Sequence, residues 1–239
     1  MASPLVTRYP AGLCDATQDG AYGNYAGLRP FRYYEWVNDF FNFVSGDWVI
    51  TETDAGSTEV ITSGAGGILA ITNVSAGATD AASIQWAGGS GAAITPFTWD
   101  STKDLLLVAK FKLSDATNAA CVVGLASVDT TPVASLPTNG VFFYKAGGAA
   151  TLLASSRKAG TSTSVTLGSM VDDTYVSVVM YYSADTGNWR CFLNDALIGT
   201  ITTSSISPTA ALTPTIGLLN ASAAAHVLSV DYMHIAVQR

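Results

Sequence analysis

Short runs of alternating apolar and polar residues cover most of the chain from residue 46 onward. The run TYVSVVMYYS at 174–183 alternates Val176, Val178, Met180 and Tyr182 with the residues between them, which is typical of a half-buried strand. Gly, Asn and Asp clusters separate the runs, and no segment carries a sustained helical stripe. We therefore expect an all-β sandwich or barrel. The predicted strands are 47–53, 57–62, 66–72, 82–86, 104–113, 119–127, 140–145, 150–156, 163–167, 174–183, 188–193, 196–202, 213–219 and 226–237.

The stretch GNWRCFLNDALIGTI at 187–201 predicts a β-hairpin with a two-residue loop at Asn194-Asp195. Asn and Asp tolerate the positive φ of a type I′ turn better than other non-glycine residues. A regular ladder from that loop predicts three pairs on one largely apolar face: Leu193 with Ala196, Cys191 with Ile198, and Trp189 with Thr200.

The first 40 residues differ from the rest, because they are dense in arginine and aromatic residues and show no sustained period. We expect an extended arm at 1–40 that leads into a single domain at 41–239, and the stretch RPFRYYEWVNDFFNF fits either a short helix or a strand. Arg and aromatic side chains are enriched at interface hot spots, although these aromatics could instead cover the open end of the sandwich. The residues predicted to bind a partner are Arg8, Tyr9, Tyr22, Tyr25, Arg29, Phe31, Arg32, Tyr33, Tyr34 and Trp36.

Charge and hydropathy limit the classes of partner that the chain is expected to bind. Only 12% of residues are charged and the net charge is −7, which argues against sequence-independent binding to nucleic acid. No apolar run approaches the roughly 20 residues of a membrane span, and no secretory signal is visible at the start, so we expect no membrane partner. Three widely spaced cysteines, Cys14, Cys121 and Cys191, predict buried thiols in a reducing compartment rather than a disulfide framework.

Two segments carry a resemblance to a fold family. The order TYVSVVMYYSADTGNWRCFLNDALIGT followed by the closing VDYMHIAVQR resembles the C-terminal half of concanavalin A-like, or laminin-G-like, jelly rolls. The resemblance implies a jelly-roll β-sandwich, and it is almost uninformative about function.

A broader resemblance is carried by TRYPAGLCDA, GAYGNYAGLRP, NDFFNFVSGDWVITETDAGS, GGILAITNVSAGATDAASIQW, KDLLLVAKFKLSDAT and DDTYVSVVMYYS. These look like virion structural proteins of tailed bacteriophages. The resemblance implies a non-enzymatic capsid decoration, or cement, protein that bridges major capsid protein subunits as a dimer or trimer. It would sit on the outer surface of the virion after assembly in the host cytoplasm. The alternative is a lectin-like module of a phage fibre or head appendage that binds host glycan.

The sequence offers little for catalysis. A retaining glycosidase needs two carboxylates about 5 Å apart, but the three glutamates, Glu35, Glu52 and Glu59, all lie before residue 60 and outside the central strands. We therefore expect no enzyme.

Other chemistry is equally sparse. His226 and His234 would share one face of a regular final strand, with Asp231 on the other, and no G-x-S-x-G elbow exists. Zinc-ligand spacing is absent. Calcium would need clustered loop carboxylates, but Asp129, Asp172, Asp173 and Asp185 form no Asp-x-Asp-x-Asp-Gly string, and loop aspartates are usually turn formers. We expect neither metal nor cofactor. Sugar binding without a metal would need exposed aromatics, for which Trp86, Trp99 and Trp189 are candidates, although tryptophan is more often core.

Overall fold

The computed structural model describes residues 33–64, 66–74, 77–202 and 211–239. Within these ranges the chain contains strands and one short 3-10 turn at Ser45–Asp47. The strands are β1 (Tyr33–Asn38), β2 (Trp48–Glu52), β3 (Thr58–Thr62), β4 (Ile68–Thr72), β5 (Ala81–Trp86), β6 (Phe97–Thr98), β7 (Leu105–Leu113), β8 (Ala119–Ala126), β9 (Gly140–Lys145), β10 (Thr151–Lys158), β11 (Thr161–Ser169), β12 (Val176–Ser183), β13 (Asn188–Leu193), β14 (Ala196–Ile201), β15 (Ala211–Asn220) and β16 (Val227–Gln238).

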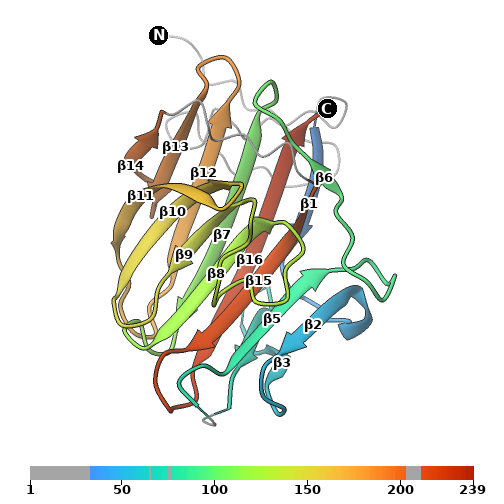
Figure 1. The fold of residues 1–239 in the computed structure, drawn as a ribbon, viewed down its shortest axis with the longest axis vertical. Coiled ribbons are helices and arrows are strands. Elements are labelled where there is room, and N and C mark those ends of the chain that lie inside the picture. The colour runs from blue at the N-terminus through green and yellow to red at the C-terminus, as the bar shows by residue number, and fades with distance from the viewer. Residues whose placement is uncertain (1–32, 65, 75–76, 203–210) are drawn as a thin grey trace.

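These strands form two antiparallel sheets that pack face to face (Figure 1). Sheet 1 has the order β14-β13-β12-β7-β16-β4-β3, and β1 pairs with the second half of β16. Sheet 2 has the order β11-β10-β9-β8-β15-β5-β2, with β6 paired to one end of β15. The predicted all-β sandwich is confirmed.

The core lies between the sheets and follows the predicted alternation. On β12 the side chains of Val176, Val178, Met180 and Tyr182 all point inward and are 6% exposed or less. Removing each such apolar side chain from water contributes roughly 1.5–3 kcal/mol to folding. Two-sided burial on β7 and β8, whose residues are nearly all buried, explains why their sequences read as continuous apolar runs.

The hairpin turn forms as the sequence predicts. Asn194 and Asp195 have φ values of 47° and 67°, and Leu193 pairs with Ala196. The side-chain oxygen of Asn194 also accepts a hydrogen bond from the backbone N–H of Ser177 at 2.9 Å. That bond ties the turn to the neighbouring strand.

Beyond the turn, the hairpin register differs from the prediction. A register shift after the turn pairs Cys191 with Gly199 and Trp189 with Ile201. Ile201 is 2% exposed and belongs to the core, so the shift brings an apolar side chain inward. The predicted pairs Cys191–Ile198 and Trp189–Thr200 are wrong, because alternation alone does not reveal a bulge.

Within the stretch whose helical or extended state the sequence left open, Tyr33–Asn38 form a strand. β1 runs antiparallel to β16, with Tyr33 opposite Gln238 and Asn38 opposite Met233. The last part of the predicted arm is therefore attached to sheet 1. Residues 1–32 lie outside the described residues, and the arm that they were predicted to form stays a prediction.

The connection between β8 and β9, residues 127–139, lies against the outer face of sheet 2 (Figure 1). The side-chain amide of Gln85 donates to the backbone oxygen of Ser127 at 3.3 Å, and its oxygen accepts from the N–H of Asp129 at 3.0 Å. Val133 from the same connection packs so closely that a Cβ on Gly217 would stand 2.6 Å from its Cγ2. The centre of this sheet face is therefore filled by the chain itself.

Candidate functional site

Three of the residues predicted to bind a partner lie within the described ranges, and their side chains have contacts inside the molecule. The Tyr33 hydroxyl donates to Asp104 at 3.3 Å, and Tyr34 stacks on Phe97 with ring centroids 5.3 Å apart. Trp36 packs against the hydrophobic core. Their part in partner binding stays a prediction. The others, outside the described residues, are Arg8, Tyr9, Tyr22, Tyr25, Arg29, Phe31 and Arg32.

An aromatic group closes the sandwich where β1 of sheet 1 approaches β2 and β5 of sheet 2. We call Trp36, Trp48, Trp86 and Phe43 the tryptophan cluster. The ring centroid of Trp48 lies 5.2 Å from that of Trp86 and 6.0 Å from that of Trp36, and both pairs meet edge to face. The ring centroids of Trp36 and Trp86 are 5.7 Å apart. Only Trp48 among the four is fully buried. The cluster is thus a rigid aromatic body with one side toward solvent.

A glycine-rich loop frames the open side of Trp86. Gly88 and Gly89 take left-handed φ values of 56° and 78°, and the N–H of Gly88 donates to the backbone oxygen of Asp47 at 3.0 Å. A Cβ on Gly88 would stand 3.0 Å from Ile94 and 3.5 Å from the indole nitrogen of Trp86. Glycine therefore keeps the edge of the indole clear, and it supplies the backbone conformation that other residues rarely adopt.

The groups available to a ligand at this point are the partly exposed indole ring of Trp86, a hydrogen-bond donor and a hydrogen-bond acceptor. Within the described ranges the indole N–H of Trp86 makes no hydrogen bond, whereas that of Trp99 donates to the backbone oxygen of Lys103. The carboxylate of Asp47 lies beside Gly89, with Oδ1 3.6 Å from where a Cβ would stand. A ligand with an apolar ring face and hydroxyl groups can use all three.

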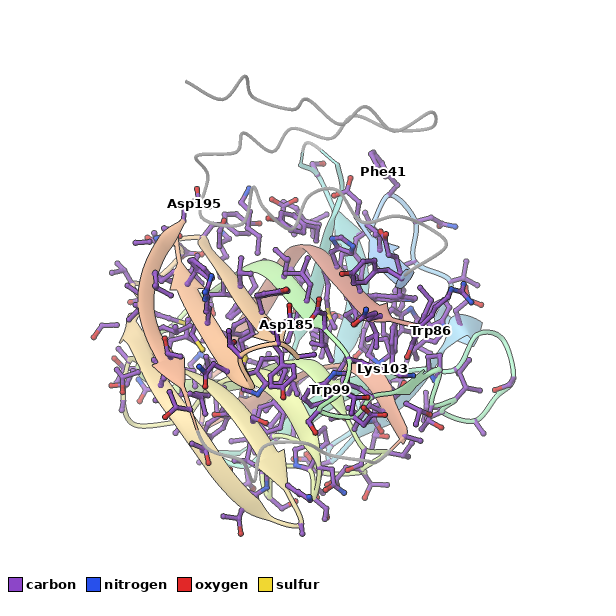
Figure 2. All side chains as sticks on the ribbon, turned by 90° about the horizontal axis from the view of Figure 1, so that it is seen from above. Phe41, Trp86, Trp99, Lys103, Asp185 and Asp195 are labelled. Atoms are coloured by element: carbon purple, nitrogen blue, oxygen red, sulfur yellow. The ribbon has the colours of Figure 1, made fainter. Side chains whose placement is uncertain are left out.

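Of the three tryptophans considered for sugar stacking, Trp86 is the one with an accessible surface. Trp99 and Trp189 are 0% exposed and pack against each other at 5.2 Å in the core. Figure 2 shows Trp86 at the rim of the molecule, and Phe41 projecting from the segment after β1. Phe41 is 77% exposed, so the connection between β1 and β2 adds a second exposed aromatic ring.

The outer face of sheet 2 has hydroxyl groups but almost no acids. Glu52, at the exposed end of β2, is the single carboxylate on the strands of this sheet. Between the 127–139 connection and β2 and β5 lies a small pocket, with about 310 Å³ of empty space that includes open solvent. The hydroxyl-bearing residues that line it are Thr51, Thr53, Thr79, Ser83, Thr130 and Thr131.

Glu52 and Glu59 are close enough to affect each other. Burial raises the pKa of Glu59, and the negative charge of Glu52 raises it further. One oxygen of Glu59 is buried without a hydrogen-bond partner. Glu59 lies opposite Ile71, which is fully buried, so its side chain turns toward the edge of the core rather than into the pocket of sheet 2.

The two histidines do not share a face. A register shift in β16 lies between Val230 and Tyr232. Val230 therefore faces the core before the shift, and Met233 faces the core after it. His226 is 3% exposed, whereas His234 lies on the outer face beside Glu35, with Nε2 and Oε2 3.3 Å apart. The predicted common face holds only for a regular strand and is therefore wrong.

A serine–histidine contact occurs at the turn before β16. The Ser222 hydroxyl and Nε2 of His226 are 3.0 Å apart, and the carboxylate of Asp115 interacts electrostatically with His226. Oδ1 of Asp115, however, accepts hydrogen bonds from the backbone N–H groups of Thr117 and Asn118 at 2.8 and 2.7 Å. Within the described ranges no carboxylate orients His226, so the contact lacks the third member of a catalytic triad.

The cysteines and acids show no metal centre in the described part of the chain. Cys121 and Cys191 are free and 0% exposed, and burial raises the pKa of each thiol to about 12. Among the described residues no group of three or more His, Cys, Asp and Glu could hold a metal ion. No helix in these ranges is long and apolar enough to cross a membrane.

No protein-family model and no curated protein matches the sequence. Solved structures do resemble it. An endo-1,3-β-glucanase from Streptomyces sioyaensis is 12% identical with a TM-score of 0.60, over 88% of this chain and 98% of that one. The Emp47p carbohydrate recognition domain is 11% identical with a TM-score of 0.58, over 87% and 98%. Peanut lectin is 10% identical with a TM-score of 0.54, over 86% and 97%.

These likenesses establish the fold. The chain is a concanavalin A-like jelly-roll β-sandwich, as the resemblance of its C-terminal half implied. At such low identity the neighbours carry no ligand or activity over to this chain. They include both glucanases and lectins, so the fold alone leaves catalysis and binding open.

Proposed function

We propose that this chain is a non-catalytic carbohydrate-binding jelly roll whose ligand lies on Trp86. The supporting observation is the partly exposed indole with an unused N–H, held by the tryptophan cluster and framed by Gly88 and Gly89. A fixed ring loses no conformational freedom when a sugar ring stacks on it, which favours binding. The Asp47 carboxylate beside Gly89 then accepts a hydrogen bond from a sugar hydroxyl.

The absence of catalysis in this proposal is supported by the acids of the described strands. Sheet 2 has one strand carboxylate, Glu52, so its outer face lacks the closely spaced pair that glycoside hydrolysis uses. On the outer face of sheet 1, Asp231 is held by Lys110 at 2.6 Å. Glu59 turns toward the edge of the core, and one of its oxygens is buried without a hydrogen-bond partner.

The proposal is tested with the full chain on a glycan array, followed by calorimetric titration of the best ligand. Trp86→Phe removes the N–H donor, and Asp47→Ala removes the acceptor. Each variant should lose one hydrogen bond, or about 1 kcal/mol of binding free energy, which weakens binding roughly fivefold. Leu197→Ala is the matched control, since Leu197 is 56% exposed on β14 and its loss should leave affinity unchanged. An array without hits, or hits that neither variant weakens, would refute the proposal.

The second candidate is the capsid decoration role, with its location on the virion surface. It is supported by the Arg- and Tyr-rich sequence before Tyr33, which enters the fold at the free end of β1. This role predicts that the purified protein binds expanded capsid shells and that a chain starting at Tyr33 does not. The structure sets that start, because removing more residues would cut into β1. Full binding by the shortened chain would rule out the role of residues 1–32.

A further inference from the structure

The part of the chain that forms β1 to β6 carries acidic residues and no cationic ones. Residues 33–102 contain eight acids and no lysine or arginine. The acids are Glu35, Asp39, Asp47, Glu52, Asp54, Glu59, Asp80 and Asp100. Strands β1, β2, β3, β5 and β6 gather on one side of the sandwich (Figure 1). This part of the molecule therefore carries net negative charge, which favours a partner of positive charge.

Within this part of the chain, β3 is the last strand of sheet 1. Among the described residues it pairs with β4 alone, so the backbone N–H and C=O groups along its other edge have no ladder partner there. Its side chains are open to solvent as well, since Val60 is 47% and Ile61 is 36% exposed. Thr58 and Thr62 at its two ends are also exposed. An open edge of this kind can pair with a further strand.

Two carboxylates lie on the inner sides of the edge strands β3 and β2. Glu59 of β3 lies opposite Ile71, and Glu52 of β2 lies opposite Ala82. Ile71 and Ala82 are both fully buried residues of the core between the sheets. Burial, and then the negative charge of Glu52, raises the pKa of Glu59, and Oε1 of Glu59 is buried without a hydrogen-bond partner. The edge therefore presents a carboxylate that lacks a donor.

We propose that the free edge of β3 binds an extended segment of a partner protein in which basic residues alternate with small apolar residues. A strand added beside β3 continues sheet 1, and its side chains alternate between the two faces of that sheet. On the inner side, its lysine or arginine side chains reach Glu59 and Glu52. On the outer side, its apolar side chains lie beside Val60, which is opposite Ala70. A charge-assisted hydrogen bond from the partner then supplies the donor that Glu59 lacks.

Charge argues against a second copy of this chain as the occupant. Pairing of β3 with β3 of another copy would bring the carboxylates of both copies to one edge, and like charges destabilise such pairing. The edge is also separate from the proposed glycan site. Strand β2 runs from Trp48, opposite Trp86, to Glu52, which is about 13 Å along an extended strand. The two proposals therefore stand or fall independently.

The experiment titrates the isotope-labelled full chain with a synthetic peptide of alternating lysine and valine, long enough to span the five residues of β3. We expect saturable chemical-shift changes at the amides of Glu59, Val60 and Ile61. A peptide with the same lysines and valines in two blocks has the same charge but cannot place its lysines on one face, and it should bind roughly tenfold more weakly.

Two methylated peptides test whether the backbone pairs. One carries methyl groups on its lysine backbone nitrogens, and the other carries them on its valine backbone nitrogens. Alternate N–H groups of a strand point to opposite edges, so methylation of one set removes the donors that face β3, and methylation of the other set does not. One of the two peptides should therefore lose binding while the other keeps it.

A pair of matched variants tests the carboxylate. Glu59→Gln keeps the size of the side chain and should weaken binding of the alternating peptide roughly tenfold. Asp195→Asn removes the same charge from the exposed turn between β13 and β14, at the opposite edge of sheet 1, and should leave the affinity unchanged. Urea unfolding of both variants checks that they remain folded.

Three results would overturn the proposal. The alternating and block peptides could bind equally well, both methylated peptides could keep full binding, or Glu59→Gln could bind as tightly as the unmodified chain. A second copy on this edge would show itself without peptide, because dilution of the chain would then shift the amide signals of Val60 and Ile61, and this result would also overturn the proposal.

Discussion

Gly217 tests how the 127–139 connection is held on sheet 2. A Cβ at this position would stand 2.6 Å from Cγ2 of Val133 and 3.3 Å from Cβ of Ser83. Carbon atoms prefer a separation of about 3.5–4.0 Å, so Gly217→Ala must push the connection outward by about 1 Å. Overpacking of this kind costs about 1–3 kcal/mol. Val133 is 4% exposed, and Val133→Ala costs about 1.5 kcal/mol for two lost methyl groups.

The double variant separates a specific clash from general disturbance. Val133→Ala removes the atom that the new Cβ would meet, so the pair should be less destabilising than the sum of the single changes by about 0.5–3 kcal/mol. The free energies of unfolding in urea of the unmodified chain, the two single variants and the double variant, obtained at a fixed m-value, measure this coupling. Gly46→Ala is the control, since a Cβ there meets nothing within 4 Å. Additive effects would refute the claim that Val133 rests on Gly217.

Three further predictions concern stability and thiol reactivity. Asp195→Gly should raise the free energy of unfolding by up to about 1 kcal/mol, because Asp195 holds a φ of 67° that glycine adopts without strain; a loss measured by urea unfolding would contradict this. Asp115→Ala should cost about 1.5–3 kcal/mol at pH 7. Hydrogen bonding from the Asn118 N–H lowers the pKa of Asp115, so the stabilisation is complete above the ordinary value of 3.8 and is lost as pH falls through the lower folded-state pKa. Thermal melts from pH 7 to pH 2 should show the difference shrinking in acid, and a constant difference would be inconsistent with this cause. Cys121 and Cys191, with pKa values of about 12, should resist alkylation at pH 8 in the folded chain and react once urea unfolds it; rapid modification of either in the native state would disprove their burial.

Alternation predicted most of the strands because inward and outward positions repeat every two residues. It did not predict β6, which has two residues and no period to read. It also missed the shifts at Cys191 and Tyr232, where one extra residue reverses the inward set. Whether Ile201 or Thr200 enters the core depends on the opposing sheet, which local sequence does not contain.

The candidate site was visible in the sequence only as one choice among three tryptophans. Trp86 differs from Trp99 and Trp189 because it ends β5 where that strand lies beside β2 and near β1. Its contact with Trp36 joins residues about 50 positions apart in the sequence. The glycines after Trp86 were the local feature of the sequence that pointed to this site, and they are equally typical of an ordinary loop. Trp36, whose predicted part in partner binding stays a prediction, packs edge to face against Trp86.

The most direct test of the account is a chemical-shift titration of the isotope-labelled full chain with the best glycan from the array. We predict that the largest shifts occur at the indole N–H of Trp86 and at the amides of Gly88 and Gly89. The amides that flank the pocket between β2 and the 127–139 connection, such as Thr51 and Thr131, should move little. Saturable shifts centred on Thr51 and Thr131, with the Trp86 indole unmoved, would contradict the central claim.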